Sequence, residues 1–369
     1  MRTLVTGGAG FIGSHLVREL VARGDDVVVL DSLEEQVHGD QVPDLPPSVE
    51  LVVGQVGDRL AAHRALAGVD RVVHLAAAVG VGQSMYEIAR YTERNTMQTA
   101  IFLEELVAQR PLPERLVVAS SMSIYGEGEY QCAEHGLMAV TPRPEDQLLA
   151  RQWEPCCPAC GGELGPVGTR EVKSLIPTSI YAITKRDHEE LCLVAGAAYG
   201  IPSVALRFFN AYGPGQALSN PYTGVAAIFA SRLLNGRPPI IFEDGEQSRD
   251  FIHVSDIVRG ILFALESERA EGHAINLGTG RPTTVIEMAR ALSAGLEVEI
   301  DPVCNHQYRA GDIRHCYADP ARAGELLGFE AQTSLEDGLR DLLDWLVGQD
   351  PVDRVDHAAR ELAARGLAR

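Results

Sequence analysis

Three side chains in the middle of the chain have the types and the spacing for proton transfer. Tyr181 and Lys185 are four residues apart in SIYAITKRDHEEL, a segment with a helical pattern, so they share one helix face. Because a nearby ammonium favours the phenolate, we expect the pKa of Tyr181 to lie below its free value of about 10. Ser121 ends the apolar run RLVVASS and offers a hydroxyl for a substrate oxygen. These candidate catalytic residues predict a tyrosine general base with two partners.

A glycine turn near the N-terminus predicts a dinucleotide site. The apolar start RTLVT leads into GGAGFIG. There Gly7 allows a tight turn, Gly10 lets a phosphate approach the backbone, and Gly13 lets the helix pack on the strand. A second strand, DDVVVLD, ends at Asp31, whose carboxylate can bind the adenine ribose hydroxyls. That acid favours NAD over NADP because it would repel a 2′-phosphate. A glycine turn without a ligand is the alternative.

The elements that must position these residues alternate between apolar strands and helical patterns. Continuous apolar runs such as DRVVHLAAAV and RLVVASS are typical of parallel strands buried on both faces. The predicted fold is α/β, a doubly wound parallel Rossmann sheet with a smaller α+β substrate lobe and a cysteine-bearing insertion. We expect an NAD-binding domain at 1–205, which contains the insertion at 127–176. Residues 250–275 are expected to return to this domain. A substrate lobe is expected at 206–345, and a surface helix or tail at 346–369. Long helices are expected at 84–109, 181–199, 283–294 and 334–347.

The composition limits the class of protein and its partners. The chain has 369 residues, of which 46% are hydrophobic and 22% charged, as in ordinary globular proteins. A net charge of −19 argues against nucleic acid and acidic membranes as partners. No apolar run approaches the ~20 residues of a membrane span, and no signal segment precedes the first strand. We therefore expect a cytoplasmic protein.

Taken together, the motifs resemble the extended short-chain dehydrogenases/reductases of the NAD-dependent nucleotide-sugar epimerase/dehydratase family. The matching segments, from residue 1 to about 345, are GGAGFIG, HLAA, SSMSIYG, PTSIYAITK, RFFNAYGPGQ, RDFIHV, NLGTG and RAGDIR. The resemblance implies that Tyr181 takes a proton from a sugar hydroxyl, usually at carbon 4, while a hydride passes to tightly bound NAD. It also implies a nucleotide-diphosphate sugar as substrate and a homodimer formed through the two long helices at 84–109 and 181–199.

Ligand contacts follow from the same resemblance and from the positions of the loops. The predicted cofactor contacts are Gly7, Gly10, Phe11, Ile12, Gly13, Asp31, Ser32, Leu33, Gln55, Val56, Leu75, Ala76, Ala77, Asn95, Tyr181 and Lys185. The predicted substrate contacts are Val81, Gln83, Ser84, Met122, Ser123, Asn210, Arg249, Arg309 and Asp312. We expect the two arginines near the diphosphate because guanidinium groups bind phosphate oxygens in pairs. His38 is a further candidate near the sugar, with a solvated loop histidine as the alternative.

Departures from the family pattern bear on the reaction. Met122 and Ser123 stand where 4,6-dehydratases carry an Asp-Glu pair that eliminates water, so epimerisation is the leading outcome. A nucleotide-sugar oxidoreductase or decarboxylase that releases a keto-sugar is the alternative, and a non-catalytic NAD-binding regulator a more remote one. Gln55 or Val56 replaces the usual adenine-contacting Asp. Several loop segments are similar to the dTDP-L-rhamnose 4-epimerase-like branch, which acts in deoxysugar biosynthesis.

The insertion at 127–176 has the spacing of a metal site. Its segments C-A-E-H and C-P-A-C are separated by 21 residues, and each tight turn points two ligands at one ion. The candidate ligands are Cys132, His135, Cys157 and Cys160. Cys156 is a substitute for His135, and reduced thiols in an exposed loop are the alternative. We expect a structural zinc that orders a loop over the mouth of the active site and takes no part in catalysis.

Overall fold

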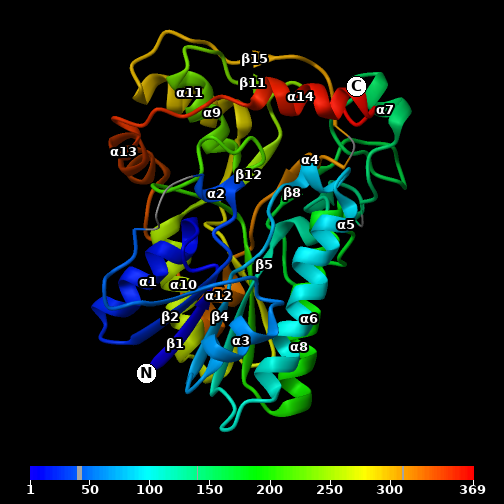
Figure 1. The fold of residues 1–369 in the computed structure, drawn as a ribbon. Helices are drawn as coiled ribbons and strands as arrows, with labels where there is room; N and C mark the ends of the chain where they lie inside the picture. Colours follow the sequence, from blue (N-terminus) through cyan, green and yellow to red (C-terminus); the bar gives the residue numbers. More distant parts are fainter. Residues whose placement is uncertain (40–43, 139, 310) are drawn as a thin grey trace.

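A seven-stranded parallel sheet forms the centre of the molecule (Figure 1). The computed structural model describes residues 1–39, 44–138, 140–309 and 311–369. The strand order is β13-β9-β5-β4-β1-β2-β3, and all neighbours are parallel. The strands are β1 (Arg2–Thr6), β2 (Asp26–Asp31), β3 (Glu50–Val53), β4 (Arg71–His74), β5 (Arg115–Ser121), β9 (Ser203–Phe208) and β13 (Ala274–Leu277). The order reverses between β1 and β4, where such sheets bind ligands at the carboxyl ends of the strands. The predicted doubly wound sheet is confirmed.

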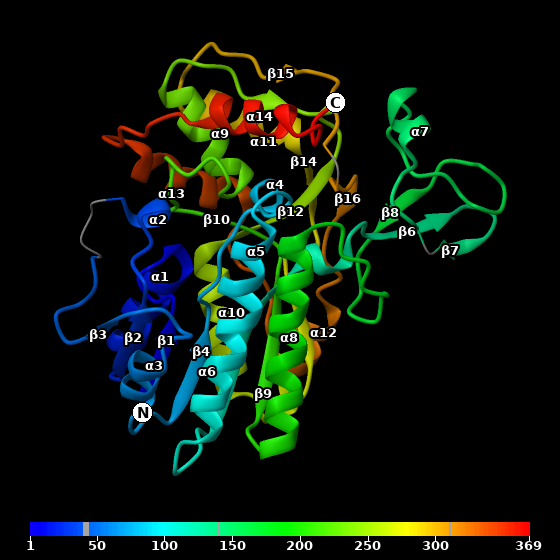
Figure 2. The same cartoon turned by 45° about the vertical axis from the view of Figure 1, so that its right-hand side comes forward.

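Helices cover both faces of this sheet. Successive side chains of a strand point to opposite faces, and in these strands the side chains on both faces are apolar. Val5 and Val29 pack toward one face, and Leu4 and Val28 toward the other. The first face is covered by α1 (Phe11–Ala22), α10 (Val254–Glu266) and α12 (Ala321–Leu327). The second is covered by α3 (Arg59–Leu66), α6 (Gln98–Val107) and α8 (Ile180–Tyr199). Figures 1 and 2 show α6 and α8 side by side.

The helix expected over 84–109 is interrupted. It consists of α4 (Val81–Ser84), α5 (Ile88–Tyr91), a π-helical turn at Thr92–Met97, and α6. Within the π turn, Asn95 is fully buried, and its side-chain amide bonds both main-chain groups of Ala78. The widened turn accommodates this inward-facing amide, and π turns are frequent at functional sites. The prediction of one continuous helix is wrong at its start, because residues 85–87 are not helical, whereas from Ile88 to Val107 the helix continues without a gap through the π turn.

A smaller α+β lobe lies over the carboxyl edge of the sheet (Figure 1). Its strands are β10 (Asn210–Tyr212), β12 (Ser248–His253), β14 (Pro282–Thr284) and β16 (His315–Cys316), with a separate pair of β11 (Ile240–Ile241) and β15 (Val303–Cys304). Its helices are α9 (Val225–Leu234), α11 (Val285–Gly295) and α13 (Leu335–Leu346). Phe229, Met288 and Leu342 join the three helices in one buried core. The chain leaves this lobe twice, first to add α10 and β13 to the central sheet and its helical layer, and later to add α12 to that layer.

The insertion projects from one side of the molecule (Figure 2). It contains α7 (Glu145–Leu149) and a three-stranded antiparallel sheet of β6 (Glu129–Cys132), β7 (Gly136–Met138) and β8 (Gly165–Val167). The sheet order is β7-β6-β8. Its buried core is small and consists of Tyr130, Cys132, Val140, Cys157 and Leu164.

The C-terminal segment forms α14 (Val355–Ala364), which packs near α4 (Figure 1). Leu362 and Ala358 of this helix are buried. A bridge between Arg309 and Ala368 attaches the last residues to the lobe. The remaining short elements are α2 (Glu35–His38) and the 3-10 turns Met122–Tyr125 and Glu268–Ala270. No helix in the described ranges is long and apolar enough to cross a membrane.

Candidate active site

A large cavity lies between the carboxyl edge of the sheet and the smaller lobe. Its volume of about 890 Å³ is in the upper part of the range for small-molecule sites. The loops after β1, β2, β4 and β5 line it from the sheet, and α9, α14 and the loops around β11 line it from the other side. This is the position at which doubly wound sheets bind their ligands.

The glycine turn at one end of the cavity has the shape that a dinucleotide pyrophosphate needs. Gly7 has a φ of +70°, a left-handed conformation that glycine adopts without strain. A Cβ at Gly13 would collide with the backbone of Gly7 and Gly8. Helix α1 begins after Gly10 with no side-chain cap, so its first N–H groups are available to an anion. The turn therefore fits NAD.

Asp31, at the end of β2, lies beside this turn. Its carboxylate accepts hydrogen bonds from the backbone N–H of Ala9 at 3.0 Å and of Leu33 at 2.9 Å. The Nε2 of His38 is 3.7 Å from the same carboxylate. His38 therefore lies beside the predicted ribose site and lines the cavity, and its contact with the sugar stays a prediction.

Most predicted cofactor contacts line the cavity. They are Gly7, Gly10, Phe11, Ile12, Gly13, Asp31, Ser32, Gln55, Val56, Leu75, Ala76, Ala77, Tyr181 and Lys185. Leu33 and Asn95 are not among the described residues that line it, which corrects their prediction as contacts. Leu33 contributes its N–H to Asp31, and Asn95 holds the loop at Ala78 and donates to Thr184 Oγ1 on α8 at 2.9 Å. Both residues position their neighbours.

Ser121, Tyr181 and Lys185 line the same cavity. The first turn of α8 is fixed by Ser84, whose Oγ accepts from the N–H of Tyr181 at 3.0 Å. Ser84 itself does not line the cavity in the described ranges, so its prediction as a substrate contact is corrected to a positioning role. The Oγ of Ser121 accepts from both the N–H and the hydroxyl of Ser123, at 3.2 and 2.9 Å. The hydroxyl proton of Ser121 therefore remains for another acceptor.

Burial decides the pKa values of the tyrosine and the lysine. It raises the pKa of Tyr181 to about 12, and a hydrogen bond from Ser121 opposes the rise. It lowers the pKa of Lys185 to about 8. The Lys185 ammonium donates to the main-chain carbonyl of Ala119 at 2.5 Å. The expectation that Lys185 would bring the pKa of Tyr181 below its free value is therefore wrong, because desolvation of the phenolate dominates.

Two buried histidines lie near Lys185. His74 and His188 both bond to the hydroxyl of Thr99 at 3.0 Å. Burial, followed by the charge of Lys185, lowers the pKa of His74 to about 3 and lowers that of His188 well below its ordinary value. Both imidazoles therefore stay neutral, and Lys185 carries the positive charge in this region.

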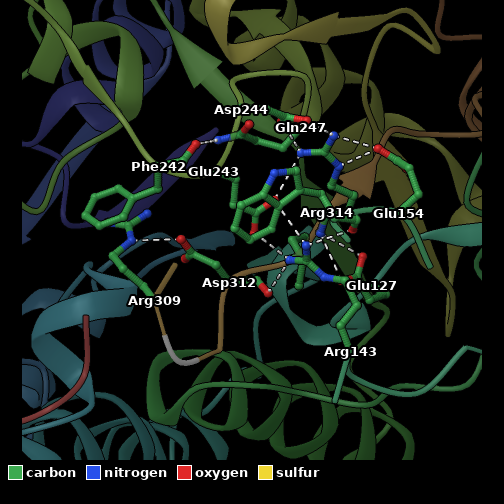
Figure 3. Close-up of polar contacts among 12 residues, drawn as sticks. Glu127, Arg143, Glu154, Phe242, Glu243, Asp244, Gln247, Arg309, Asp312 and Arg314 are labelled. Atoms are coloured by element: carbon green, nitrogen blue, oxygen red, sulfur yellow. Dashed lines mark hydrogen bonds and ion pairs between the residues drawn. The ribbon is translucent and has the colours of Figure 1, made fainter. Parts of the chain in front are cut away.

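The predicted substrate residues form the rest of the wall. Those that line the cavity are Val81, Gln83, Met122, Ser123, Asn210, Arg249, Arg309 and Asp312. The Nε of Arg309 donates to Asp312 at 2.8 Å, and its guanidinium lies 4.5 Å from the centre of the Phe242 ring (Figure 3). Arg249 donates to three main-chain carbonyls, those of Ser248, Ile313 and Arg314. Arg309 therefore has more free donor capacity toward a ligand than Arg249.

Two glutamines in the wall were missed by the sequence reasoning. Gln216 and Gln247 line the cavity together with Asn210. Each of the three has a buried amide oxygen with no hydrogen-bond partner within the described ranges. The amide nitrogens of the two glutamines donate to the carbonyls of Ala211 and Phe242, which fixes the orientation of both amides. Buried acceptors without donors indicate a polar ligand. Single amides in loops have no motif that would reveal them.

The four predicted metal ligands converge in the insertion. One ligand atom from each of Cys132, His135, Cys157 and Cys160 lies within 4.8 Å of the other three. Cys156 is exposed, and its sulfur approaches the carbonyl of Glu154 instead. The geometry therefore favours His135 over Cys156 as the fourth member.

Comparison with known proteins agrees with the geometry of the cavity. Residues 3–144 and 160–278 match the NAD dependent epimerase/dehydratase family, and the unmatched 145–159 lie in the insertion. A dTDP-L-rhamnose 4-epimerase of Burkholderia thailandensis is 35% identical over 94% of both chains. A UDP-N-acetyl-alpha-D-glucosaminuronate decarboxylase of Bacillus cytotoxicus is 29% identical over 93% of this chain and 97% of that one.

A solved structure supports the same conclusion. The UDP-glucose 4-epimerase of Thermus thermophilus in complex with NAD is similar with a TM-score of 0.75 and 30% identity, covering 95% of this chain and 100% of the other. The chain therefore belongs to the NAD-dependent epimerase/dehydratase family of extended short-chain dehydrogenases/reductases.

Proposed function

We propose that this protein is an NAD-dependent nucleotide-sugar 4-epimerase. The observation that carries the proposal is the convergence of Ser121, Tyr181 and Lys185 with the glycine turn on one cavity. The resemblance to a dTDP-L-rhamnose 4-epimerase supports a deoxysugar nucleotide as substrate, and with it a role in deoxysugar biosynthesis.

Proton transfer at carbon 4 falls to Tyr181. Its phenolate accepts the proton of the C4 hydroxyl, and Ser121 donates a hydrogen bond to the same sugar oxygen. NAD, which the glycine turn and Asp31 would hold, would supply the reversible hydride acceptor for C4. Because burial raises the pKa of Tyr181, the phenolate needs compensating positive charge, which Lys185 and the nicotinamide of NAD, when bound, would supply. When the hydride returns to the opposite face of the 4-keto-sugar, Tyr181 gives the proton back, and the configuration is inverted without net oxidation.

The remaining lining residues divide between the two ligands. We assign the glycine turn and Asp31 to the pyrophosphate and ribose of NAD, with Gln55 and Val56 at its adenine. Arg309 and Arg249 are assigned to the substrate diphosphate. The sugar contacts are assigned to Val81, Gln83, Met122, Ser123 and Asn210.

The residues after Ser121 support epimerisation over dehydration. Met122 and Ser123 follow it directly, and neither side chain can act as a carboxylic acid or a carboxylate base. Decarboxylation requires a uronic acid, and one relative has that activity in its name. Net oxidation requires release of the keto-sugar. The test described below distinguishes decarboxylation and net oxidation from epimerisation.

A homodimer is part of the proposal. Ile183 and Val194 on α8 are 43% and 68% exposed, and Met97, just before α6, is 57% exposed. Ile183 and Val194 are eleven residues apart, so they share one helix face. These exposed apolar side chains support pairing with a second copy. We expect a dimer by sedimentation and a monomer for the double variant Ile183→Glu/Val194→Glu.

The free state of all seven cysteines supports a reducing, cytoplasmic setting.

The proposed activity is tested by incubating the purified protein with dTDP-L-rhamnose and, in parallel, with UDP-glucose and UDP-glucuronic acid. NMR would follow conversion to the C4 epimer while absorbance reports NADH. Interconversion without accumulation of NADH supports the epimerase. Stoichiometric NADH with a released keto-sugar, or loss of CO2 from the uronic acid, contradicts it in favour of the oxidoreductase or the decarboxylase.

A further inference from the structure

The cysteine and histidine cluster connects the two halves of the insertion. Cys132 and His135 flank the turn between β6 and β7, and Cys157 and Cys160 belong to the loop before β8. Gly136 and Gly161 follow one ligand of each pair and have φ values of +71° and +73°. These left-handed turns let the chain reverse immediately after a ligand. Two tight turns therefore face each other with four ligand atoms between them.

Three of the distances within the cluster have the values of a tetrahedral zinc site. The Sγ of Cys132 is 3.8 Å from the Sγ of Cys160 and 3.5 Å from the Nδ1 of His135. The Sγ of Cys157 is 3.7 Å from the same Nδ1. With Zn–S bonds of about 2.3 Å and a Zn–N bond of about 2.0 Å, tetrahedral ligand atoms lie about 3.5–3.8 Å apart. Three thiolates and an imidazole are a common structural zinc set.

The insertion needs such a link because it has little hydrophobic core. Its buried cluster contains five residues, and two of them are Cys132 and Cys157. A segment with so few apolar contacts gains little stability from burial, and small modules of this kind are commonly stabilised by a metal. We propose that Cys132, His135, Cys157 and Cys160 bind one Zn²⁺, and that this ion holds the substrate wall of the cavity in place through the insertion.

The connection to the substrate wall of the cavity starts at Arg143. This residue belongs to the insertion, and its side chain contacts the smaller lobe. Arg143 donates to both carboxylate oxygens of Glu243, at 3.0 and 2.8 Å, and to the carbonyl of Trp153 at 2.9 Å (Figure 3). Glu154, which follows Trp153, accepts from the Nε of Arg314 at 2.7 Å. The insertion thus contributes one cation, Arg143, and two anions, Glu127 and Glu154, to a buried ionic network.

The lobe supplies the other side of the network. Arg314 donates to Glu243 at 3.0 Å and to both oxygens of Asp244 at 2.7 and 3.0 Å. Glu127, at the start of the insertion, accepts from the N–H of Arg314. Glu243 has a φ of +56°, a conformation that costs about 1 kcal/mol or more and persists where neighbours hold the residue. The two arginines hold Glu243 in this conformation.

The network continues into the cavity wall. Glu243 and its neighbour Phe242 line the cavity, as do Gln247, Arg309 and Asp312. The carbonyl of Asp312 accepts from Arg143, and Arg309 lies against the Phe242 ring (Figure 3). The wall that the network supports therefore contains Arg309, one of the two arginines that we assign to the diphosphate. Ser121, Tyr181 and Lys185 belong to β5 and α8, which are not part of this network.

The predicted effect of zinc on nucleotide binding rests on the proposed function, because it assumes that this wall binds the substrate. The prediction that the four residues bind zinc does not depend on that function. Loss of the ion should weaken nucleotide binding by about tenfold, because a displacement of about 1 Å in a binding wall costs up to about 10²-fold. It should leave kcat unchanged. Cys160→Ser removes a ligand at an exposed position. Cys156→Ser is the matched control because Cys156 is a neighbouring exposed thiol outside the cluster.

The experiment measures zinc per chain by mass spectrometry and the Kd of dTDP and of UDP by calorimetry, on NAD-containing protein. We expect one zinc in the wild type and in Cys156→Ser, none in Cys160→Ser, and weaker nucleotide binding only in Cys160→Ser. Replacement of zinc by Co²⁺ in the wild type should give the visible bands of tetrahedral thiolate coordination. If Cys160→Ser does not fold, chelation and zinc re-addition on the wild type give the same comparison.

Three outcomes would overturn the proposal. Absence of stoichiometric zinc, with the three cluster cysteines titrating as free thiols, contradicts the site. Unchanged nucleotide affinity in zinc-free protein contradicts the connection to the wall. A wild type that binds zinc but neither nucleotide contradicts both the connection and the proposed substrate class, while the zinc site stands. Failure of the site and failure of the proposed function are therefore distinguishable.

Discussion

Arg143 of the insertion and Glu243 of the smaller lobe form a bidentate ion pair that is buried almost completely. Their N···O distances are 3.0 and 2.8 Å, and the side chains are 3% and 4% exposed. Removal of one member of a buried pair leaves an uncompensated charge, which typically costs about 3–5 kcal/mol. The ion pair therefore holds the insertion against the smaller lobe, and each of its charges compensates the other.

The first prediction concerns this ion pair. Arg143→Met should lower the free energy of unfolding by about 3 kcal/mol, measured by urea denaturation of zinc-containing protein. Arg340→Met is the control, because Arg340 is 63% exposed in its pair with Asp337 and such pairs contribute about 0–1 kcal/mol. Equal changes in the two variants would contradict a stabilising role for the buried pair.

A second prediction concerns Lys185 and pH. Because burial lowers its pKa from 10.5 to about 8, the unfolded chain binds this proton more tightly than the folded protein. Near pH 7 the charged lysine therefore costs the folded state about 3 kcal/mol. This cost disappears as the pH rises from about 8 to 10.5. In nucleotide-free protein, the unfolding free energy of the wild type should rise over this window relative to Lys185→Met. If the unfolding free energies of the two proteins changed in parallel with pH, the low pKa of Lys185 would be excluded.

The third prediction concerns the glycine turn, where one added methyl group should weaken cofactor binding. Gly13→Ala places a Cβ against the backbone of Gly7 and Gly8. Such overpacking typically costs about 1–3 kcal/mol. We expect the purified variant to contain far less NAD than the wild type, measured after denaturation by chromatography. The control is Gly324→Ala on α12, where a Cβ meets its nearest atom at 3.8 Å. Wild-type NAD content in Gly13→Ala would contradict the assigned site.

A fourth prediction concerns Gln247 and its buried amide oxygen. Gln247→Met removes an acceptor that has no partner within the described ranges and also removes the hydrogen bond to the carbonyl of Phe242, so the unfolding free energy should fall by about 1 kcal/mol. The KM for the nucleotide-sugar should rise by about tenfold, because the ligand loses a buried hydrogen bond. Gln349→Met, at an exposed position, should change neither quantity. An unchanged KM in Gln247→Met would remove this residue from the substrate site.

The sheet, the glycine turn and the three candidate catalytic residues could be predicted from the sequence because each depends on local pattern. Apolar runs define the strands, and Ser121 is placed at the sheet edge as soon as β5 is recognised. The four metal-ligand candidates were also found, since each pair is local. These features needed no knowledge of distant contacts.

Other features depend on contacts between distant parts of the chain. Ser84 and Asn95 were predicted as ligand contacts, but their partners on α8 are 97 and 89 residues away. The pKa of Tyr181 depends on burial, which the four-residue spacing to Lys185 does not reveal. Arg143 and Glu243 are 100 residues apart, and neither belongs to a motif. The ionic network was therefore not predictable from the sequence.

The most direct test of the central claim compares the wild type with Tyr181→Phe on dTDP-L-rhamnose. NMR measures the rate of C4 epimerisation, and absorbance measures net NADH. We expect the wild type to interconvert the epimers without net NADH, and Tyr181→Phe to lose about 10²–10⁴-fold in rate while it retains bound NAD. Turnover by Tyr181→Phe at the wild-type rate would contradict the assignment of Tyr181 as the base.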